Sequence, residues 1–208
     1  MKTVVCVSQK GGTGKTTLAV HLAVAAERAG KAAVLIDLDP QASAAAWGDL
    51  RKEEGPAIES VQPARLAPTL KAAADAGCEL ALIDTPARSE NTALDAVRVS
   101  DLALVPCRPG FFDTAAMSFT ANLLKLAGKP GFVIYSQVGS RAAKWRLDDL
   151  TEALTIYNLT PAPVVVHQLD AYKDGIPAGL AAQEYEPKGK AAAEATALYR
   201  WLESVIAK

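Results

Sequence analysis

The sequence has no long apolar run, almost no net charge and few cysteines, and each of these absences excludes a class of protein. No stretch approaches the roughly 18 consecutive apolar residues of a membrane-spanning helix. Lysine and arginine number 22 against 23 aspartates and glutamates, so bulk charge does not hold the chain to nucleic acid or membranes. The N-terminal apolar stretch is too short for a signal peptide, and we expect a cytoplasmic protein.

The three cysteines, Cys6, Cys78 and Cys107, lie far apart and form no Cys-x-x-Cys pair. Neither a disulfide framework nor a zinc site is therefore indicated. Cys6 and Cys107 lie in apolar runs, where a cysteine is usually a small buried residue. His21 and His167 have no companions typical of a metal site or a catalytic triad, and we assign them no chemistry.

Hydrophobic residues make up 50% of the 208 positions, which is enough for a sizeable core in a single domain covering residues 1–208. Short apolar runs recur along the chain, and they are continuous rather than alternating. Continuous runs of this length predict strands buried on both faces of a parallel sheet. The runs are 3–8, 32–37, 79–84, 102–107, 131–136 and 163–167, with a weaker candidate at 57–62.

Stretches typical of helices separate these runs, at 16–29, 43–53, 65–76, 90–99, 113–127, 144–157 and 190–206. Alternating strands and helices predict an α/β fold, with a doubly wound, mostly parallel sheet covered by helices on both faces. In such a sheet the ligand lies beyond the carboxyl ends of the strands. Because the first strand begins at about residue 3, we expect no N-terminal helix-turn-helix.

The strongest chemical signal is the glycine-rich segment 9–17, QKGGTGKTT, between a predicted strand and a predicted helix. Glycines let successive backbone N–H groups point at one phosphate, next to the positive end of a helix. Lys15 can reach the β- and γ-phosphates, and the Thr16 hydroxyl can ligate Mg²⁺. The usual P-loop pattern has glycine where this chain has Gln9. We predict a P-loop NTPase fold whose nucleotide-binding residues are Gly11, Gly12, Thr13, Gly14, Lys15, Thr16 and Thr17.

Two further segments place carboxylates at the ends of predicted strands. Asp37 ends one apolar run, Asp39 follows two residues later, and Asp84 ends another run. A carboxylate at this edge can orient Mg²⁺, usually through water, so we predict that Asp37 and Asp84 serve the metal together with Thr16. Alternatively, Asp37 is a helix cap and Asp39-Pro40 is only a turn.

Together these motifs resemble those of the ParA/MinD family of deviant Walker-A ATPases, and most of all its small plasmid-type ParA partition proteins. Residues 10–17, KGGTGKTT, match the family's phosphate loop with its additional lysine, and 37–41, DLDPQ, match its second motif. Residues 106–113, PCRPGFFD, look like a third family segment, and 168–187 are similar to its closing loop and helix. The resemblance therefore covers essentially the whole chain.

The resemblance implies ATP and Mg²⁺ as cofactors and a homodimer that encloses two ATP molecules. Lys10 would then reach the phosphates bound to the other copy, where a second cation can stabilise the transferring phosphoryl group. Lys10, Lys15 and Asp39 are the residues expected to act in hydrolysis, with Asp39 positioning the attacking water. Leu169 departs from the family, which often has arginine at this position.

Two other features are less specific than the phosphate loop. Gln137 follows a predicted strand, where it can approach the adenine at the edge of the sheet. Arg141, Lys144 and Arg146 form a small basic cluster that can contact DNA phosphates, although a solvated helix start gives the same pattern.

As a function, the resemblance implies a partition ATPase. Its ATP-bound dimer would bind DNA non-specifically in the nucleoid, and a ParB-like or other small adaptor protein would stimulate hydrolysis. The cargo would be a plasmid, a chromosome region or a protein cluster. One alternative is a MinD-like switch on a membrane surface, but the C-terminal stretch 198–208 carries too few cations and is typical of a docked helix. Another is a metabolic P-loop enzyme such as an amidoligase or an iron–sulfur reductase, although the reductase would need paired cysteines.

Overall fold

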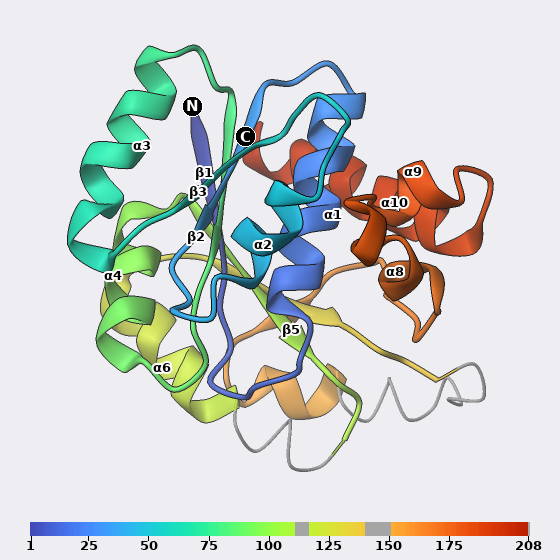
Figure 1. The fold of residues 1–208 in the computed structure, drawn as a ribbon. Coiled ribbons are helices and arrows are strands. Elements are labelled where there is room, and N and C mark those ends of the chain that lie inside the picture. Colours follow the sequence, from blue (N-terminus) through green and yellow to red (C-terminus); the bar gives the residue numbers. More distant parts are fainter. Residues whose placement is uncertain (111–116, 140–150, 208) are drawn as a thin grey trace.

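Seven strands form one sheet in the computed structural model, which describes residues 1–110, 117–139 and 151–207 (Figure 1). They lie in the order β3-β2-β4-β1-β5-β6-β7, and every pairing between neighbouring strands is parallel. The predicted α/β fold with a doubly wound parallel sheet is confirmed. The strands are β1 (Lys2–Cys6), β2 (Ala33–Asp37), β3 (Ala57–Ser60), β4 (Leu80–Asp84), β5 (Leu102–Cys107), β6 (Gly131–Tyr135) and β7 (Thr160–Pro161).

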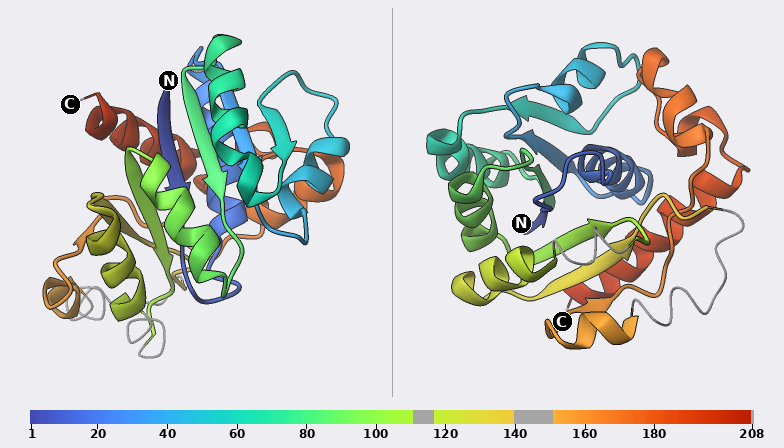
Figure 2. Two further views of the ribbon diagram at one scale, coloured as in Figure 1. Left: turned by 90° about the vertical axis from the view of Figure 1, so that its left-hand side faces the viewer. Right: turned by 90° about the horizontal axis from the view of Figure 1, so that it is seen from below.

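Helices cover both faces of the sheet, as Figures 1 and 2 show. The first face carries α1 (Lys15–Arg28), α2 (Ser43–Asp49) and α10 (Lys190–Ile206), and the second carries α3 (Leu66–Asp75), α4 (Glu90–Val99) and α6 (Met117–Ala127). Shorter turns are η1 (Pro63–Arg65), α8 (Ala171–Asp174), η2 (Ile176–Ala178) and α9 (Ala182–Tyr185). Within the described ranges, no helix is both long and apolar enough to cross a membrane.

The two cores follow from the alternation of side chains along the buried strands. In β1, Val4 and Cys6 pack into the core under α1 and α10, whereas Val5 packs into the core under α4 and α6. Every residue of β2, β4 and β5 is buried. The apolar runs are continuous because these strands have no face in contact with water.

The last strand differs from its prediction. The run at 163–167 does not form it: β7 is Thr160–Pro161, and 163–167 contributes one isolated bridge, between His167 and Val138. Pro161 and Pro163 have no amide hydrogen to donate to a neighbouring strand, so regular pairing ends early.

The second helix is also shorter than predicted. It ends at Asp49 rather than at residue 53, directly after Gly48. Glycine is a poor helix former, and the chain turns there so that Arg51 reaches the C-terminal part of the molecule.

Some predicted features lie outside the described residues. They are residues 113–116 of the helix predicted at 113–127, residues 144–150 of the helix predicted at 144–157, residues 111–113 of the third family segment, and the basic cluster Arg141, Lys144 and Arg146.

A buried ion pair ties the chain after α2 to the segment before α10. The Arg51 guanidinium donates to both carboxylate oxygens of Glu184, at 2.9 and 3.0 Å, and to the carbonyl oxygens of Gly179 and Gly55. It also lies 4.5 Å from the centre of the Trp47 ring. The two charged side chains are only 5% and 12% exposed, so solvent screens their attraction weakly.

We expect Arg51→Ala to lower the free energy of unfolding by about 3 kcal/mol, because it leaves the Glu184 carboxylate buried without its partner. The matched control is Lys71→Ala, which breaks an exposed ion pair with Asp75 and should cost less than about 0.5 kcal/mol. Urea denaturation of the three proteins measures both values. Equal losses in the two variants would contradict the structural role of this ion pair.

Candidate functional site

The carboxyl ends of β1, β2 and β4 bring the predicted site residues to one edge of the sheet. Asp84 lies in register with Cys6 of β1 and with Asp37 of β2. The segment 7–14 leaves β1 at this edge and leads directly into α1. The glycine-rich loop and the strand-end carboxylates therefore meet where a parallel sheet binds its ligands.

The phosphate loop turns where its sequence has glycine. Gly12 and Gly14 have φ angles of 71° and 97°, a left-handed region that other residues enter only at a cost. The turn at Gly14 lets α1 begin at Lys15, so the free N–H groups of its first turn adjoin the loop. This arrangement supplies backbone donors and the positive end of a helix to an anionic ligand.

Lys15 is held over this loop with little exposure to water. Its side chain is 7% exposed, and Nζ donates to the carbonyl oxygen of Lys10 at 3.4 Å. Burial lowers the pKa of Lys15 from its ordinary value, and the charges of Asp84 and Asp39 oppose that shift. A bound phosphate would supply this ammonium with an anion in a site of low dielectric constant.

The side chains of Asp84 and Thr16 lie together beside the loop and offer oxygen ligands to a metal ion. Thr16 Oγ1 donates to Asp84 Oδ2 at 2.6 Å, while Asp84 Oδ1 is buried with no hydrogen-bond partner among the described residues. Burial raises the pKa of Asp84 to about 7, and the nearby charge of Asp37 adds to the effect. A hydroxyl beside a carboxylate with an unused oxygen fits Mg²⁺, which prefers hard oxygen ligands and commonly binds through one carboxylate and a nucleotide.

Asp37 has a different environment from the one expected of a metal ligand. It is fully buried, and its Oδ2 accepts the N–H groups of Ala44 and Ala45 in the first turn of α2. Its Oδ1 accepts the N–H group of Asp39 at 3.0 Å. The carboxylate thus caps α2, the alternative that the sequence left open, and its contact with Mg²⁺ stays a prediction.

Asp39 lies on the loop that Asp37 stabilises. Its side chain is half-buried, and Oδ1 accepts the N–H group of Gln41 at 3.0 Å, which forms the turn expected after Asp39-Pro40. The structure brings Asp39 close enough to Lys15 for their charges to interact. Lys15 and Asp39, which are predicted to act on the γ-phosphate bound to their own copy, therefore lie at the same edge of the sheet.

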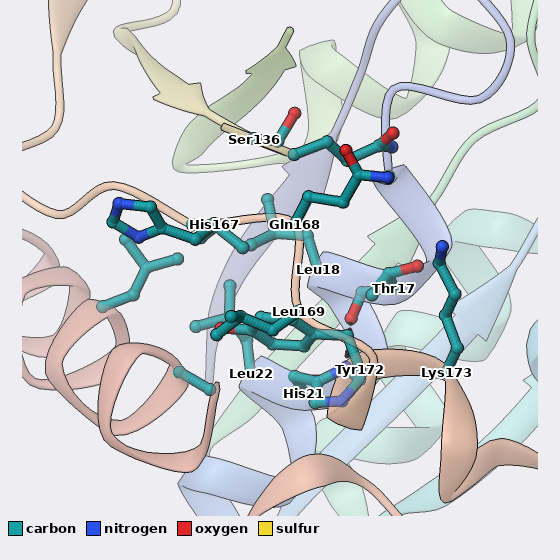
Figure 3. A pocket seen from close by; sticks show the side chains of 15 residues that line it. Thr17, Leu18, His21, Leu22, Ser136, His167, Gln168, Leu169, Tyr172 and Lys173 are labelled. Atoms are coloured by element: carbon teal, nitrogen blue, oxygen red, sulfur yellow. Dashed lines mark hydrogen bonds between the residues drawn. The ribbon is translucent and has the colours of Figure 1, made fainter. Parts of the chain in front are cut away.

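An apolar cavity of about 110 Å³ adjoins the phosphate loop (Figure 3). Leu18 and Leu22 of α1 line it together with Leu169, Tyr172 and Leu198, which lie far away in the sequence. The cavity reaches Gly14 and Thr17 of the phosphate site. It therefore offers apolar walls to the part of a nucleotide that lies beyond its phosphates.

Gln137 lies where this cavity meets the phosphate loop. Its Nε2 donates to the Gly12 carbonyl oxygen at 2.7 Å, and the hydroxyl of Ser136 donates to the Thr13 carbonyl oxygen at 2.8 Å. The segment after β6 thus fastens the loop that follows β1. Contact between Gln137 and adenine stays a prediction, and the fastening role of Ser136 was not anticipated from the sequence.

His21 is a cavity residue to which the sequence pattern gave no role. Its Nδ1 lies 2.7 Å from the Thr17 carbonyl oxygen and therefore carries the hydrogen, whereas Nε2 is buried with no partner in the described part of the chain. Burial lowers the pKa of His21 to about 4, so the ring is neutral at physiological pH. The ring packs edge-to-face against Tyr172 at 4.9 Å.

The segment that carries Leu169 is anchored to α10. Glu194 accepts hydrogen bonds from the backbone N–H group of His167 at 3.0 Å and from the Tyr172 hydroxyl at 3.3 Å, and its other oxygen lies 2.6 Å from His167 Nδ1. Leu169, where the resembling family often has arginine, is a wall of the cavity. Its role here is apolar packing.

A family model for the CobQ/CobB/MinD/ParA nucleotide binding domain matches residues 4–174. The chain belongs to this family. The chain is therefore an ATPase that uses ATP and Mg²⁺. The predicted resemblance to ParA and MinD is confirmed.

Several members of this family are similar to the chain over much of its length. The maintenance of carboxysome distribution protein A of Gloeobacter kilaueensis is 32% identical, over 96% of this chain and 91% of that protein. The chromosome-partitioning ATPase Soj of Thermus thermophilus is 31% identical, over 56% of this chain and 57% of that protein.

The fold is also that of solved MinD structures. The septum site-determining protein MinD of Pyrococcus horikoshii, complexed with Mg-ADP, superimposes with a TM-score of 0.78, covering 99% of this chain and 97% of that chain. The sequences are 19% identical, so this likeness concerns the fold alone.

The buried carboxyl of Asp84 should make the ligand-free protein less stable as pH rises. The pKa is raised in the folded state, so the stabilisation from the bound proton is complete below the unfolded pKa of about 4 and is lost as pH rises through about 7. Without Mg²⁺ and nucleotide, we expect the Tm of Asp84→Asn to fall less than that of the wild type between pH 5.5 and pH 8.5. The difference between the two falls should be several degrees.

Thermal unfolding of the wild type, Asp84→Asn and the exposed control Asp95→Asn across this range provides the test. The control should follow the wild type. Parallel curves for the wild type and Asp84→Asn would show that the Asp84 carboxyl is not held protonated.

Proposed function

We propose that residues 1–208 form a single-domain positioning ATPase of the ParA type. Mg·ATP closes two copies into a dimer, the dimer binds DNA without sequence preference, and a ParB-like or other adaptor protein stimulates hydrolysis and release. The observation that carries the proposal is the placing of two lysines, Lys10 and Lys15, on one phosphate loop beside the Thr16–Asp84 pair. One nucleotide needs only one of these lysines on its own loop.

Within one copy, each polar side chain has a distinct task. Gly11 to Thr17 wrap the phosphates with backbone N–H groups, and the Lys15 ammonium neutralises the β- and γ-phosphates. Thr16 and Asp84 hold Mg²⁺, which when bound offsets charge on the phosphates. Asp39 orients the attacking water, and Asp37 sets the position of Asp39 through its hydrogen bond to the Asp39 N–H group.

The second lysine gives the dimer its dependence on ATP. Two copies that meet through their nucleotide edges bring two negatively charged phosphate groups toward each other, which costs free energy unless cations lie between them. Lys10 provides such a cation from each copy, at the start of the phosphate loop. Without bound ATP the same lysines have no phosphate to contact, so the dimer is favoured only in the ATP state.

Substitution of the two lysines should therefore have different effects on ATP binding and on dimer formation. We expect Lys15→Ala to abolish ATP binding, because the buried ammonium that contacts the phosphates is lost. Lys10→Ala should bind one ATP per monomer but fail to form the ATP-dependent dimer. Calorimetry measures binding, and light scattering with Mg·ATP measures dimer formation.

Wild-type protein whose Tm does not rise in millimolar Mg·ATP would contradict nucleotide binding itself, since any ligand of the folded state stabilises it. A Lys10→Ala protein that dimerises like the wild type would instead remove only the role of Lys10 between copies.

DNA binding and cargo positioning are proposed from the relatives. One relative is named for carboxysome distribution and another for chromosome partitioning, so the proposed class of cargo extends from DNA to protein clusters. We propose a cytoplasmic protein that associates with the nucleoid when ATP is bound. The cations of this contact are Arg141, Lys144 and Arg146, in the part of the chain that the structure does not describe.

Binding to DNA should require ATP and weaken steeply with salt. A dimer joins two basic patches on one duplex, so avidity rises while each phosphate contact stays salt-sensitive. We expect the triple variant Arg141→Ala, Lys144→Ala, Arg146→Ala to lose most of its affinity and to flatten the salt dependence, with ATP binding unchanged. Gel shifts on two unrelated duplexes at increasing salt measure this.

The matched control is Lys125→Ala, Lys129→Ala, which removes cations beside the amino end of β6 and should retain DNA binding. If no duplex is retarded by the ATP-bound wild type at low salt, the DNA-binding step of the proposal is wrong.

The membrane-surface alternative has less support. It needs an apolar helix face that is free to enter a lipid surface. In α10, Leu198 and Leu202 are buried in the core, and Trp201 packs edge-to-face against Phe132 of β6 at 5.0 Å. The apolar face of the C-terminal helix is thus used in the fold.

A further inference from the structure

The loop after β4 contains an arginine in a backbone conformation that favours glycine. Arg88 has φ 65°. Among the described residues, the other non-glycine residues with positive φ are Ala42, Gln137 and Asn158. Ala42, Arg88 and Gln137 all follow strands at the nucleotide edge of the sheet. Left-handed backbone at a non-glycine residue is unfavourable, and it concentrates at functional sites because the side chain is needed there.

Arg88 is adjacent to the start of the phosphate loop. The neighbouring Ala87 packs near Gly11, since a Cβ atom placed on Gly11 would lie 3.9 Å from that of Ala87. Arg88 lines the same small cavity as Ser8 and Gln9, directly before Lys10. Arg88 therefore lies on the side of the loop that carries Lys10.

The guanidinium of Arg88 has no partner in the described part of the chain. The residue is exposed, and within the described ranges its side chain makes no hydrogen bond or ion pair. The ion pairs of Arg51 and Arg98 show that other arginines of the structure do find carboxylates. An exposed cation at a strained position, with no partner among the residues that the structure describes, is available to a ligand or to a second copy.

We propose that Arg88 is a second cation of the dimer interface, which contacts the phosphates of the ATP bound to the facing copy. The inference rests on the proposed ATP-dependent dimer. Guanidinium is suited to this task because its planar fork donates two parallel hydrogen bonds to phosphate oxygens. Beside Lys10 it stabilises the negative charge that builds up on the transferring phosphoryl group, which is where an added arginine accelerates phosphoryl transfer most.

The variant Arg88→Gly distinguishes contact with the phosphates of the facing copy from a purely structural role of Arg88 in its loop. Glycine removes the charge and also the backbone strain, so a loop residue with no further task should be replaced at no cost to activity. We expect Arg88→Gly to have a ligand-free Tm at least as high as that of the wild type and to bind ATP as a monomer within about twofold. Its ATP turnover should fall at least tenfold, and Arg88→Lys should recover only part of the loss.

The assays use the full chain with Mg·ATP, and they measure ATP binding by calorimetry, dimer formation by light scattering and turnover by phosphate release. Arg88→Gly protein that dimerises and hydrolyses ATP like the wild type overturns the inference and leaves the proposed function standing. Wild-type protein that binds ATP but never dimerises overturns the proposed dimer and this inference with it.

Mixed dimers show from which copy Arg88 acts. Arg88→Gly keeps its own Asp39, and Asp39→Ala keeps its Arg88. In a mixed dimer the Arg88→Gly copy would therefore have a complete site if the arginine comes from the other copy. We expect an equal mixture to hydrolyse ATP faster than the mean of the two separate variants. A rate equal to that mean places Arg88 on its own nucleotide and overturns the assignment between copies.

Discussion

The burial of Asp84 at the carboxyl end of β4 is the constraint on which the site depends. A carboxylate that is 1% exposed, in register with Asp37 on the next strand, cannot ionise at low cost without a cation nearby. Lys15 and the Thr16 hydroxyl supply part of that compensation within the chain. In the proposed site, magnesium and a nucleotide would complete it, and the ligand would remove an unfavourable interaction that the fold itself creates.

The same edge is linked mechanically to the C-terminal part of the molecule. Asp37 caps α2 and accepts the N–H group of Asp39, so the position of the loop that carries Asp39 depends on that helix. The chain after α2 is fixed in turn by Arg51 to Glu184, on the segment that leads into α10. Any shift of Asp39 is therefore resisted or transmitted through packed and ion-paired groups rather than through a free loop.

The sequence predicted the features that depend on local order along the chain. Continuous apolar runs located five strands, a weaker pattern located β3, and the glycine spacing located the phosphate loop, because backbone conformation and burial leave a direct pattern in neighbouring residues. The strand predicted at 163–167 was wrong because prolines interrupt regular pairing there. The cavity could not be predicted from the sequence, because Leu18, Tyr172 and Leu198 come together only after the chain has folded. Whether Asp37 caps a helix or serves the metal likewise depended on where α2 lies.

Both edges of the sheet are poor templates for another strand. β7 has two residues and ends in Pro161, which lacks a donor, and β3 at the opposite edge has four. Short edge strands, and at β7 the proline, disfavour the continuation of one sheet into the sheet of a neighbouring molecule. Copies of this chain are thereby protected from open-ended, amyloid-like stacking, and any contact between them would be left to side chains and bound ligands.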